Sequence, residues 1–139
     1  MTLLFSAVMR AIYKRQRYST EELLVSNSRY SAIIADTPTK RSIGLMFRDR
    51  LGNSECMLFK FDVPGSYGIW MLNMNFSIDI VWLDENKMVV DLVENAAPCR
   101  SFFRCKTYTP KGKAAYVVEF ASGAIGKENI AKGSFMAFK

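Results

Sequence analysis

The sequence of 139 residues contains no histidine. Without an imidazole of its own, the chain cannot form a Ser-His-Asp or Cys-His catalytic group, a histidine-ligated zinc or haem site, or a histidine pH switch. The sequence also lacks the glycine-rich patterns of phosphate and dinucleotide sites and the Gly-x-Ser-x-Gly pattern of serine hydrolases. These absences exclude the commonest enzyme chemistries, and we predict no cofactor and no metal site.

Acidic residues are absent from the first eighteen residues. A short apolar stretch at 3–9 precedes four basic residues, Arg10, Lys14, Arg15 and Arg17. This order is the reverse of a secretory signal peptide, and the stretch is shorter than the about twenty apolar residues of a membrane span. Three interpretations stay open: an amphipathic helix in peripheral contact with a membrane or partner through residues 1–18, a helix packed on the body, or a loosely ordered extension.

The rest of the chain has little net charge. The whole sequence carries 19 basic and 13 acidic residues, but residues 19–139 hold fifteen basic against all thirteen acidic ones, with the signs interspersed. A nucleic-acid module would cluster its basic groups on one face, so nucleic acid is not an expected partner. Half of the residues are apolar and 13% are aromatic, which is typical of a packed globular domain.

Three cysteines permit at most one disulfide within the chain. Cys99 and Cys105 do not have the Cys-x-x-Cys spacing of zinc knuckles or thioredoxin-like sites, but their spacing suits a bridge that closes a short loop. Such a bridge indicates an oxidising compartment or the cytosol of a hyperthermophile. Cys56 precedes an apolar run and is predicted to be a small buried hydrophobe rather than a nucleophile.

The pattern of short apolar runs and turns predicts a mainly β (α+β) domain: a compact, antiparallel, barrel-like sheet of six to seven short strands with two short helices. Too few helices are expected for βαβ crossovers. We assign residues 1–28 to an N-terminal extension and residues 29–139 to a single β-rich domain. The helices are expected near 38–48 and 121–130, and the strands at 29–35, 56–62, twice within 67–83, and at 88–93, 115–120 and 133–138.

Asp79 is the candidate functional carboxylate, because it interrupts an otherwise apolar strand. By alternation it shares a face with Ser77, Val81 and Leu83, so it must be hydrogen-bonded, paired or neutral. We predict Arg41 as its partner, since a guanidinium binds a carboxylate with two parallel hydrogen bonds.

A second candidate group lies around Trp70, Met71 and Asn73 and combines flat apolar surface with amide groups. Such a group suits a cleft for a sugar or an extended peptide, although the same side chains also fill cores. The predicted binding residues are Arg41, Trp70, Met71, Asn73, Asp79 and Tyr108.

Six blocks in order resemble a known family: Arg41–Arg48, Met57–Phe61, Trp70–Met74, Ile78–Asp84, Val93–Cys99, and Cys105 with Tyr108. Over residues 29–138 the chain is similar to domain-of-unknown-function family 192. The resemblance implies a compact, largely β, barrel-like fold found mostly in bacteria and archaea, often behind a signal sequence or lipoprotein anchor. It implies no reaction.

The chain departs from that family's pattern in two places. Residues 130–134 replace the usual Lys-Val-Gly-Asp ending, so the terminal aspartate is missing. The expected export signal is replaced by the apolar and then basic segment at the N-terminus. The family and the cysteine pair therefore indicate an extracytoplasmic protein, the absence of a signal peptide indicates a cytoplasmic one, and the localisation stays open.

The absence of a catalytic group favours a non-enzymatic binding or accessory β domain for a polymer, peptide or protein partner. One alternative is a small hydrolase-like enzyme that uses Asp79 for acid/base chemistry with Arg41 or Tyr108. The other is a domain docked on an anionic membrane through its basic N-terminal segment. A raised pKa at Asp79 in a solvent-reached pocket would favour the enzyme, whereas a buried pair with Arg41 would favour the binding module.

Overall fold

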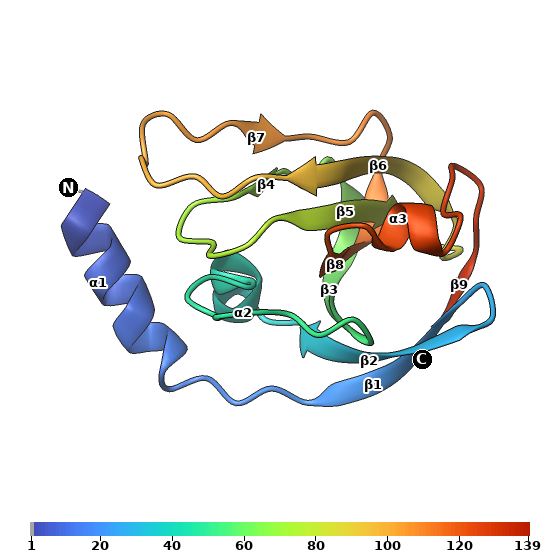
Figure 1. Ribbon diagram of the computed structural model, residues 1–139, viewed down its shortest axis with the longest axis horizontal. Coiled ribbons are helices and arrows are strands. Elements are labelled where there is room, and N and C mark those ends of the chain that lie inside the picture. Colours follow the sequence, from blue (N-terminus) through green and yellow to red (C-terminus); the bar gives the residue numbers. More distant parts are fainter. Residues whose placement is uncertain (1) are drawn as a thin grey trace.

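The computed structural model describes residues 2–139 and shows a curled sheet with one long helix at its side (Figure 1). The described residues form three helices and nine strands. The elements are α1 (Thr2–Tyr13), β1 (Thr20–Val25), β2 (Ser28–Ala35), α2 (Pro38–Ile43), β3 (Glu55–Gly65), β4 (Ile69–Trp70), β5 (Ile78–Leu83), β6 (Val89–Ala96), β7 (Thr107–Tyr108), β8 (Ala114–Ala121), α3 (Ala124–Lys127) and β9 (Met136–Ala137).

Seven strands form the main sheet in the order β6-β5-β8-β3-β2-β1-β9, and β4 pairs with β7 in a separate two-stranded ribbon. The two edges of the main sheet approach each other, because Phe135 next to β9 forms a bridge with Met88 next to β6. The sheet is therefore a half-barrel, and the predicted mainly β, barrel-like fold is confirmed. The predicted strands at 29–35, 56–62 and 115–120 correspond to β2, β3 and β8.

One strand pair is parallel, and the expectation that the fold contains no βαβ crossover is wrong for it. β2 and β3 run in the same direction with Ala32 opposite Cys56. The connection between them contains α2 and is long enough to carry the chain back, so that β3 begins at the same end of the sheet as β2. The other strand pairs are antiparallel.

The central strands are buried on both faces. In β5, Val81 and Leu83 pack into a core under α3, whereas Ile80 and Trp82 pack into a second core on the opposite face of the sheet. We call these the α3-side core and the cleft-side core. All six residues of β5 are buried, which is why this segment reads as a nearly continuous apolar run in the sequence.

The N-terminal segment forms a helix that packs on the body. Phe5, Met9, Ile12 and Tyr13 lie on one face of α1 and contact a cluster around Ile43. The main sheet then begins at Thr20, earlier than the predicted domain boundary, because Leu23 and Val25 alternate into the core beside β2. Within residues 2–139 no helix combines the length and the apolar character needed to cross a bilayer.

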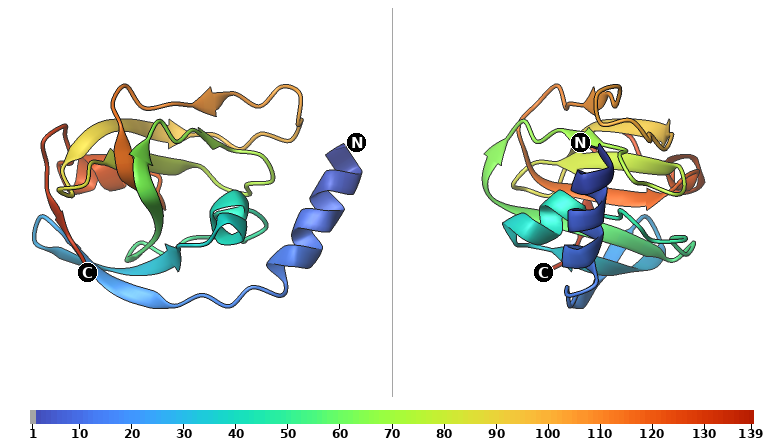
Figure 2. Two further views of the ribbon diagram at one scale, coloured as in Figure 1. Left: turned by 180° about the vertical axis from the view of Figure 1, so that it is seen from behind. Right: turned by 90° about the vertical axis from the view of Figure 1, so that its left-hand side faces the viewer.

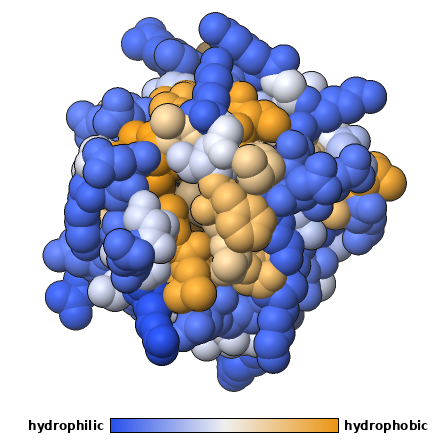
Figure 3. Space-filling view, turned by 90° about the vertical axis from the view of Figure 1, so that its right-hand side faces the viewer, coloured by the Kyte–Doolittle hydropathy of each residue, from blue (hydrophilic) through white to orange (hydrophobic). Residues whose placement is uncertain are grey.

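The opposite end of the molecule, where β9 and the β1–β2 turn lie, shows apolar side chains gathered in one area and surrounded by hydrophilic ones (Figure 3). Phe135, which is 55% exposed, belongs to the segment that leads into β9 at this end. This end therefore exposes apolar surface to solvent.

Candidate functional site

A cleft of about 490 Å³ lies between α2, the turn that follows it, the second half of β3 and the segment around β4. This volume falls within the roughly 300–1,000 Å³ of small-molecule sites. Most of the lining is apolar or aromatic. The apolar and aromatic lining residues are Ile43, Leu45, Met46, Phe59, Phe61, Val63, Tyr67, Ile69, Trp70 and Met74.

The wall formed by α2 depends on how the helix begins and ends. Thr37 caps its first turn by accepting a hydrogen bond from the Lys40 N–H at 3.2 Å, and Pro38 occupies the first helical position. The helix ends at Gly44, whose φ of +54° favours glycine. A Cβ atom at this position would also approach the Phe59 ring to 3.3 Å. Gly44 therefore lets the chain turn sharply and lie against the aromatic wall.

Glu119 lines the cleft from the central strand β8. Glu119 is 3% exposed and is paired in register with Met57 of β3 on one side and Ile80 of β5 on the other, on the cleft-side face. Among residues 2–139, no group forms a hydrogen bond or an ion pair with this carboxyl group. Burial alone raises its pKa from 4.5 to about 8, so the carboxyl group retains its proton at neutral pH. Of the two acidic residues that line the cleft in the described part of the chain, Asp62 is exposed and Glu119 is buried.

Arg41 also lines the cleft, but it does not pair with Glu119 or Asp79. Its guanidinium donates a hydrogen bond of 2.9 Å to the Lys60 carbonyl and lies 5.1 Å from the centre of the Phe61 ring. Phe61 in turn stacks on Tyr67 with the ring centres 3.6 Å apart. The side chain is thereby held against β3 as part of the cleft wall.

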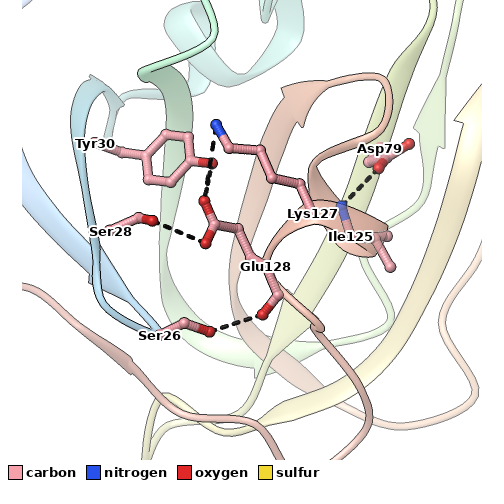
Figure 4. Close-up of polar contacts among 7 residues, drawn as sticks. All are labelled: Ser26, Ser28, Tyr30, Asp79, Ile125, Lys127 and Glu128. Carbon is pink, nitrogen blue, oxygen red and sulfur yellow. Dashed lines mark hydrogen bonds and ion pairs between the residues drawn. The ribbon is translucent and has the colours of Figure 1, made fainter.

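Asp79 is fully buried on the other face of the sheet, under α3 (Figure 4). Its carboxylate accepts hydrogen bonds from three backbone amides: Asn95 at 2.8 Å, Gly123 at 3.1 Å and Ile125 at 2.9 Å. The predicted ion pair with Arg41 is therefore wrong, because backbone donors at the start of α3 and in β6 satisfy the carboxylate instead. These bonds join β5, β6 and α3.

A second buried carboxylate joins α3 to the first hairpin (Figure 4). Glu128 accepts hydrogen bonds from Ser28 Oγ at 2.9 Å and Tyr30 Oη at 2.6 Å, and Ser26 Oγ donates to its backbone carbonyl at 2.7 Å. Burial and the hydrogen bond to Glu128 both raise the pKa of Tyr30. This group is saturated by partners within the chain, so it resembles a structural tie rather than an open site.

The remaining predicted binding residues are dispersed. Trp70 lines the cleft, whereas Met71 is buried in the cleft-side core and Tyr108 lies in β7 beside Lys106. Asn73 lies under α1, where its side-chain oxygen accepts a hydrogen bond of 3.0 Å from Ser6. The structure thus brings Arg41 and Trp70 to one cleft and adds Glu119.

Sequence reasoning missed Glu119, although a signal for it was present. An acidic residue inside the apolar run 114–121 is the same kind of interruption that singled out Asp79. In the adjacent strands β5 and β8, Asp79 is opposite Phe120, and Glu119 is the residue before Phe120. Because side chains alternate along a strand, that offset of one residue places the two carboxyl groups on opposite faces.

The cysteines follow the prediction. Cys99 and Cys105 form a disulfide that closes the loop before β7, and this loop packs on α1 through Phe102. Cys56 is a free and buried thiol, and burial raises its pKa to about 12, which makes it a poor nucleophile. No group of three or more metal-ligating side chains occurs in the described part of the chain.

Several curated proteins are similar to this chain. A UPF0127 protein of Thermococcus kodakarensis is 28% identical over 105 residues, which cover 76% of this chain and 62% of the relative. UPF0127 proteins of Thermococcus sibiricus and Pyrococcus horikoshii are each 36% identical, over 66% and 70% of this chain and 55% and 76% of their own lengths. The chain spans less than two thirds of the first of these relatives.

Two solved structures share the fold. A candidate transcription regulator from Sinorhizobium meliloti matches 89% of this chain and 97% of its own length with a TM-score of 0.80 and 22% identity. A protein of unknown function from Novosphingobium aromaticivorans matches 86% and 84% with a TM-score of 0.74 and 24% identity. At this identity they show the fold alone. A profile of the DUF192 family, described as an uncharacterized ACR, matches residues 22–138.

Proposed function

Since this chain belongs to the DUF192 family, whose description assigns no activity, we propose its function from the site itself: it is a non-enzymatic binding module for a polymer, peptide or protein partner. The observation that carries the proposal is Glu119, an unpaired carboxyl group at a cleft that solvent can enter. The carboxyl oxygens of Glu119 are not among the buried atoms that lack a partner, so they are open to the cleft. A ligand that pairs with them would exchange water for a hydrogen bond in an apolar setting, where such a bond is stronger.

The protonation state of Glu119 selects the ligand chemistry. Because its pKa is raised to about 8, the carboxyl group both donates and accepts a hydrogen bond at neutral pH. An amide group offers the complementary donor and acceptor in one plane. Amides occur in every peptide bond, in Asn and Gln side chains, and in N-acetylated sugars, which agrees with a peptide or polymer partner.

The walls of the cleft suit the rest of such a ligand. Phe61, Tyr67 and Trp70 line the cleft and are partly exposed, so their rings provide flat apolar surface on which a peptide side chain or a sugar ring can pack. Asp62 and Val63 line the cleft and are exposed, so they lie where the ligand would continue toward solvent. The ligand would thus be anchored at Glu119 and extend past β3.

The test is a titration of isotope-labelled protein with short peptides and N-acetylated oligosaccharides, followed by NMR. We expect shifts at Trp70 and in β8, and an affinity that falls as the pH rises above 8. Glu119→Gln should bind the ligand as tightly as the wild type does at pH 7, because its amide also donates and accepts a hydrogen bond. Its affinity should not depend on pH. Glu119→Leu should bind at least tenfold more weakly, and Glu85→Leu, at an exposed turn, is the matched control. Ligands that bind Glu119→Leu and the wild type equally would refute the proposal.

An acid/base enzyme is the second candidate, and Glu119 rather than Asp79 would carry it. A carboxylic acid with a raised pKa in a cleft is the usual state of a general acid at neutral pH. The Gln variant separates the two functions, because an amide can bind a ligand but cannot transfer a proton. Turnover of an ester, glycoside or peptide that disappears in Glu119→Gln while binding persists would establish the enzyme.

A further inference from the structure

The outer face of α1 is apolar and has no partner among the described residues. Phe5 and Met9 face the body, whereas Leu3 is 88% exposed and Leu4 is 70% exposed, and Val8 is exposed one turn further along. Figure 2 (right) looks onto this end of the molecule and shows α1 lying across it. Adjoining exposed apolar side chains on one helix, here Leu3, Leu4 and Val8, are typical of an interaction surface.

The disulfide loop adds a second element to the same end. Phe102 packs against Phe5 with ring centres 5.3 Å apart and against Trp70 at 5.5 Å, which holds the loop beside the helix. The next residue, Phe103, is 75% exposed. The bridge between Cys99 and Cys105 closes this loop, so it presents Phe103 next to α1 in a restricted conformation. We call residues 2–18 and the loop 99–106 together the basic end.

The basic end carries the net charge of the protein. Residues 2–18 contain four basic and no acidic side chains, and the loop adds Arg100, Arg104 and Lys106, again with no acidic residue. The remaining parts of the chain hold twelve basic and thirteen acidic residues, which nearly cancel. Seven cations therefore lie in the two segments that also expose Leu3, Leu4, Val8 and Phe103.

We propose that the basic end docks the protein on the surface of an anionic phospholipid membrane. Exposed leucines and an aromatic side chain enter the boundary between headgroups and acyl chains, while the surrounding Arg and Lys side chains pair with phosphate and carboxylate groups. A nucleic acid would attract the cations but leave the leucines in water. The combination of apolar and basic groups on one end therefore fits a lipid surface. Leu3, Leu4 and Phe103 do not line the ligand cleft, although Phe102 of the loop contacts Trp70, which does.

The test measures sedimentation of the full-length protein with vesicles of phosphatidylcholine alone or with 30% phosphatidylserine. Binding should require phosphatidylserine and weaken between about 50 and 300 mM salt, because exposed charges are screened. Phe103→Ser and Leu4→Ser should each reduce partitioning about tenfold, as expected for removing one large apolar side chain from the lipid. Arg104→Gln should reduce it about fivefold.

Matched controls exist at the opposite end of the molecule. Phe135→Ser removes another exposed phenylalanine, and Arg29→Gln removes another exposed positive charge. Both should bind vesicles like the wild type, and unfolding in urea should show that every variant is folded. Equal binding to both vesicle types, or equal losses in Phe103→Ser and Phe135→Ser, would overturn the proposal. Tight binding to duplex DNA without binding to vesicles would overturn it and assign the cations to nucleic acid.

Discussion

Replacing Asp79 by asparagine tests whether this carboxylate is a structural tie. The carboxylate accepts three backbone hydrogen bonds, one on Oδ1 and two on Oδ2. An asparagine of the same shape has a single acceptor oxygen. In its better orientation it keeps the bonds from Gly123 and Ile125, but its NH₂ group then faces the N–H of Asn95, so two donors meet.

The energetic effect follows from this geometry. One hydrogen bond to a charged acceptor is lost, which is worth about 1.5–3 kcal/mol, and one amide in a partly buried position loses its partner. The negative charge beside the first turn of α3 is also removed. We therefore expect Asp79→Asn to lower the free energy of unfolding by about 3 kcal/mol. Asp79→Ala, which removes all three acceptors, should lower it by about 5 kcal/mol or more, which approaches the total stability of many domains.

The assay is urea unfolding at pH 7, followed by tryptophan fluorescence. With an m-value of about 2 kcal/mol/M, the midpoint for Asp79→Asn should fall by about 1.5 M. Asp49→Asn makes the same chemical change at an exposed residue and should leave the midpoint unchanged. A midpoint for Asp79→Asn within about 0.25 M of the wild type would refute the structural role and return Asp79 to the functional candidates.

Three further predictions concern the titrating and thiol groups. The folded protein holds a proton on Glu119 up to a pKa of about 8, whereas the unfolded chain releases it near its ordinary value of 4.5. The contribution of Glu119 to stability therefore decreases as pH rises from about 4.5 to 8, and Glu119→Gln should gain stability relative to wild type across that window in urea unfolding. Cys56 should not react with a thiol reagent at pH 8 until urea unfolds the protein, and rapid labelling of the native state would contradict its burial. The double variant Cys99→Ser with Cys105→Ser should lose about 2 kcal/mol by the loop-entropy estimate, and a reductant should lower the wild-type melting temperature but not that of the variant.

Part of the candidate site could be read from local patterns. The helix predicted near 38–48 begins at Pro38 as expected, but α2 ends at Ile43, where Gly44 turns the chain. The adjacent apolar blocks predict β3 and β5, so one wall of the cleft was foreseeable. The aromatic and methionine residues around Trp70 were also foreseen as cleft candidates. The cleft that Trp70 lines exists only because α2 packs against β3 and the segment around β4, which the local patterns do not specify.

The partner of a buried polar group could not be predicted in the same way. Arg41 was a reasonable partner for Asp79 because their charges are opposite, but backbone amides of α3 and β6 reach the carboxylate instead. The beginning of the sheet at β1 was missed because Glu21 and Glu22 give the segment a polar start, and only pairing with β2 makes it a strand.

The sequence by itself determined the class of this protein: a small β-rich domain of the DUF192 family with a disulfide loop, a buried free thiol and no histidine chemistry of its own. These properties depend on composition, on alternation over a few residues and on close spacing in the chain. Tertiary structure alone decided which acidic residue is satisfied and which is left open. Asp79 and Glu119 both interrupt apolar strands, but the register of β5 against β8 places one under α3 and the other in the cleft. That difference follows from the packing of distant segments, because each strand presents its alternate side chains to different neighbours.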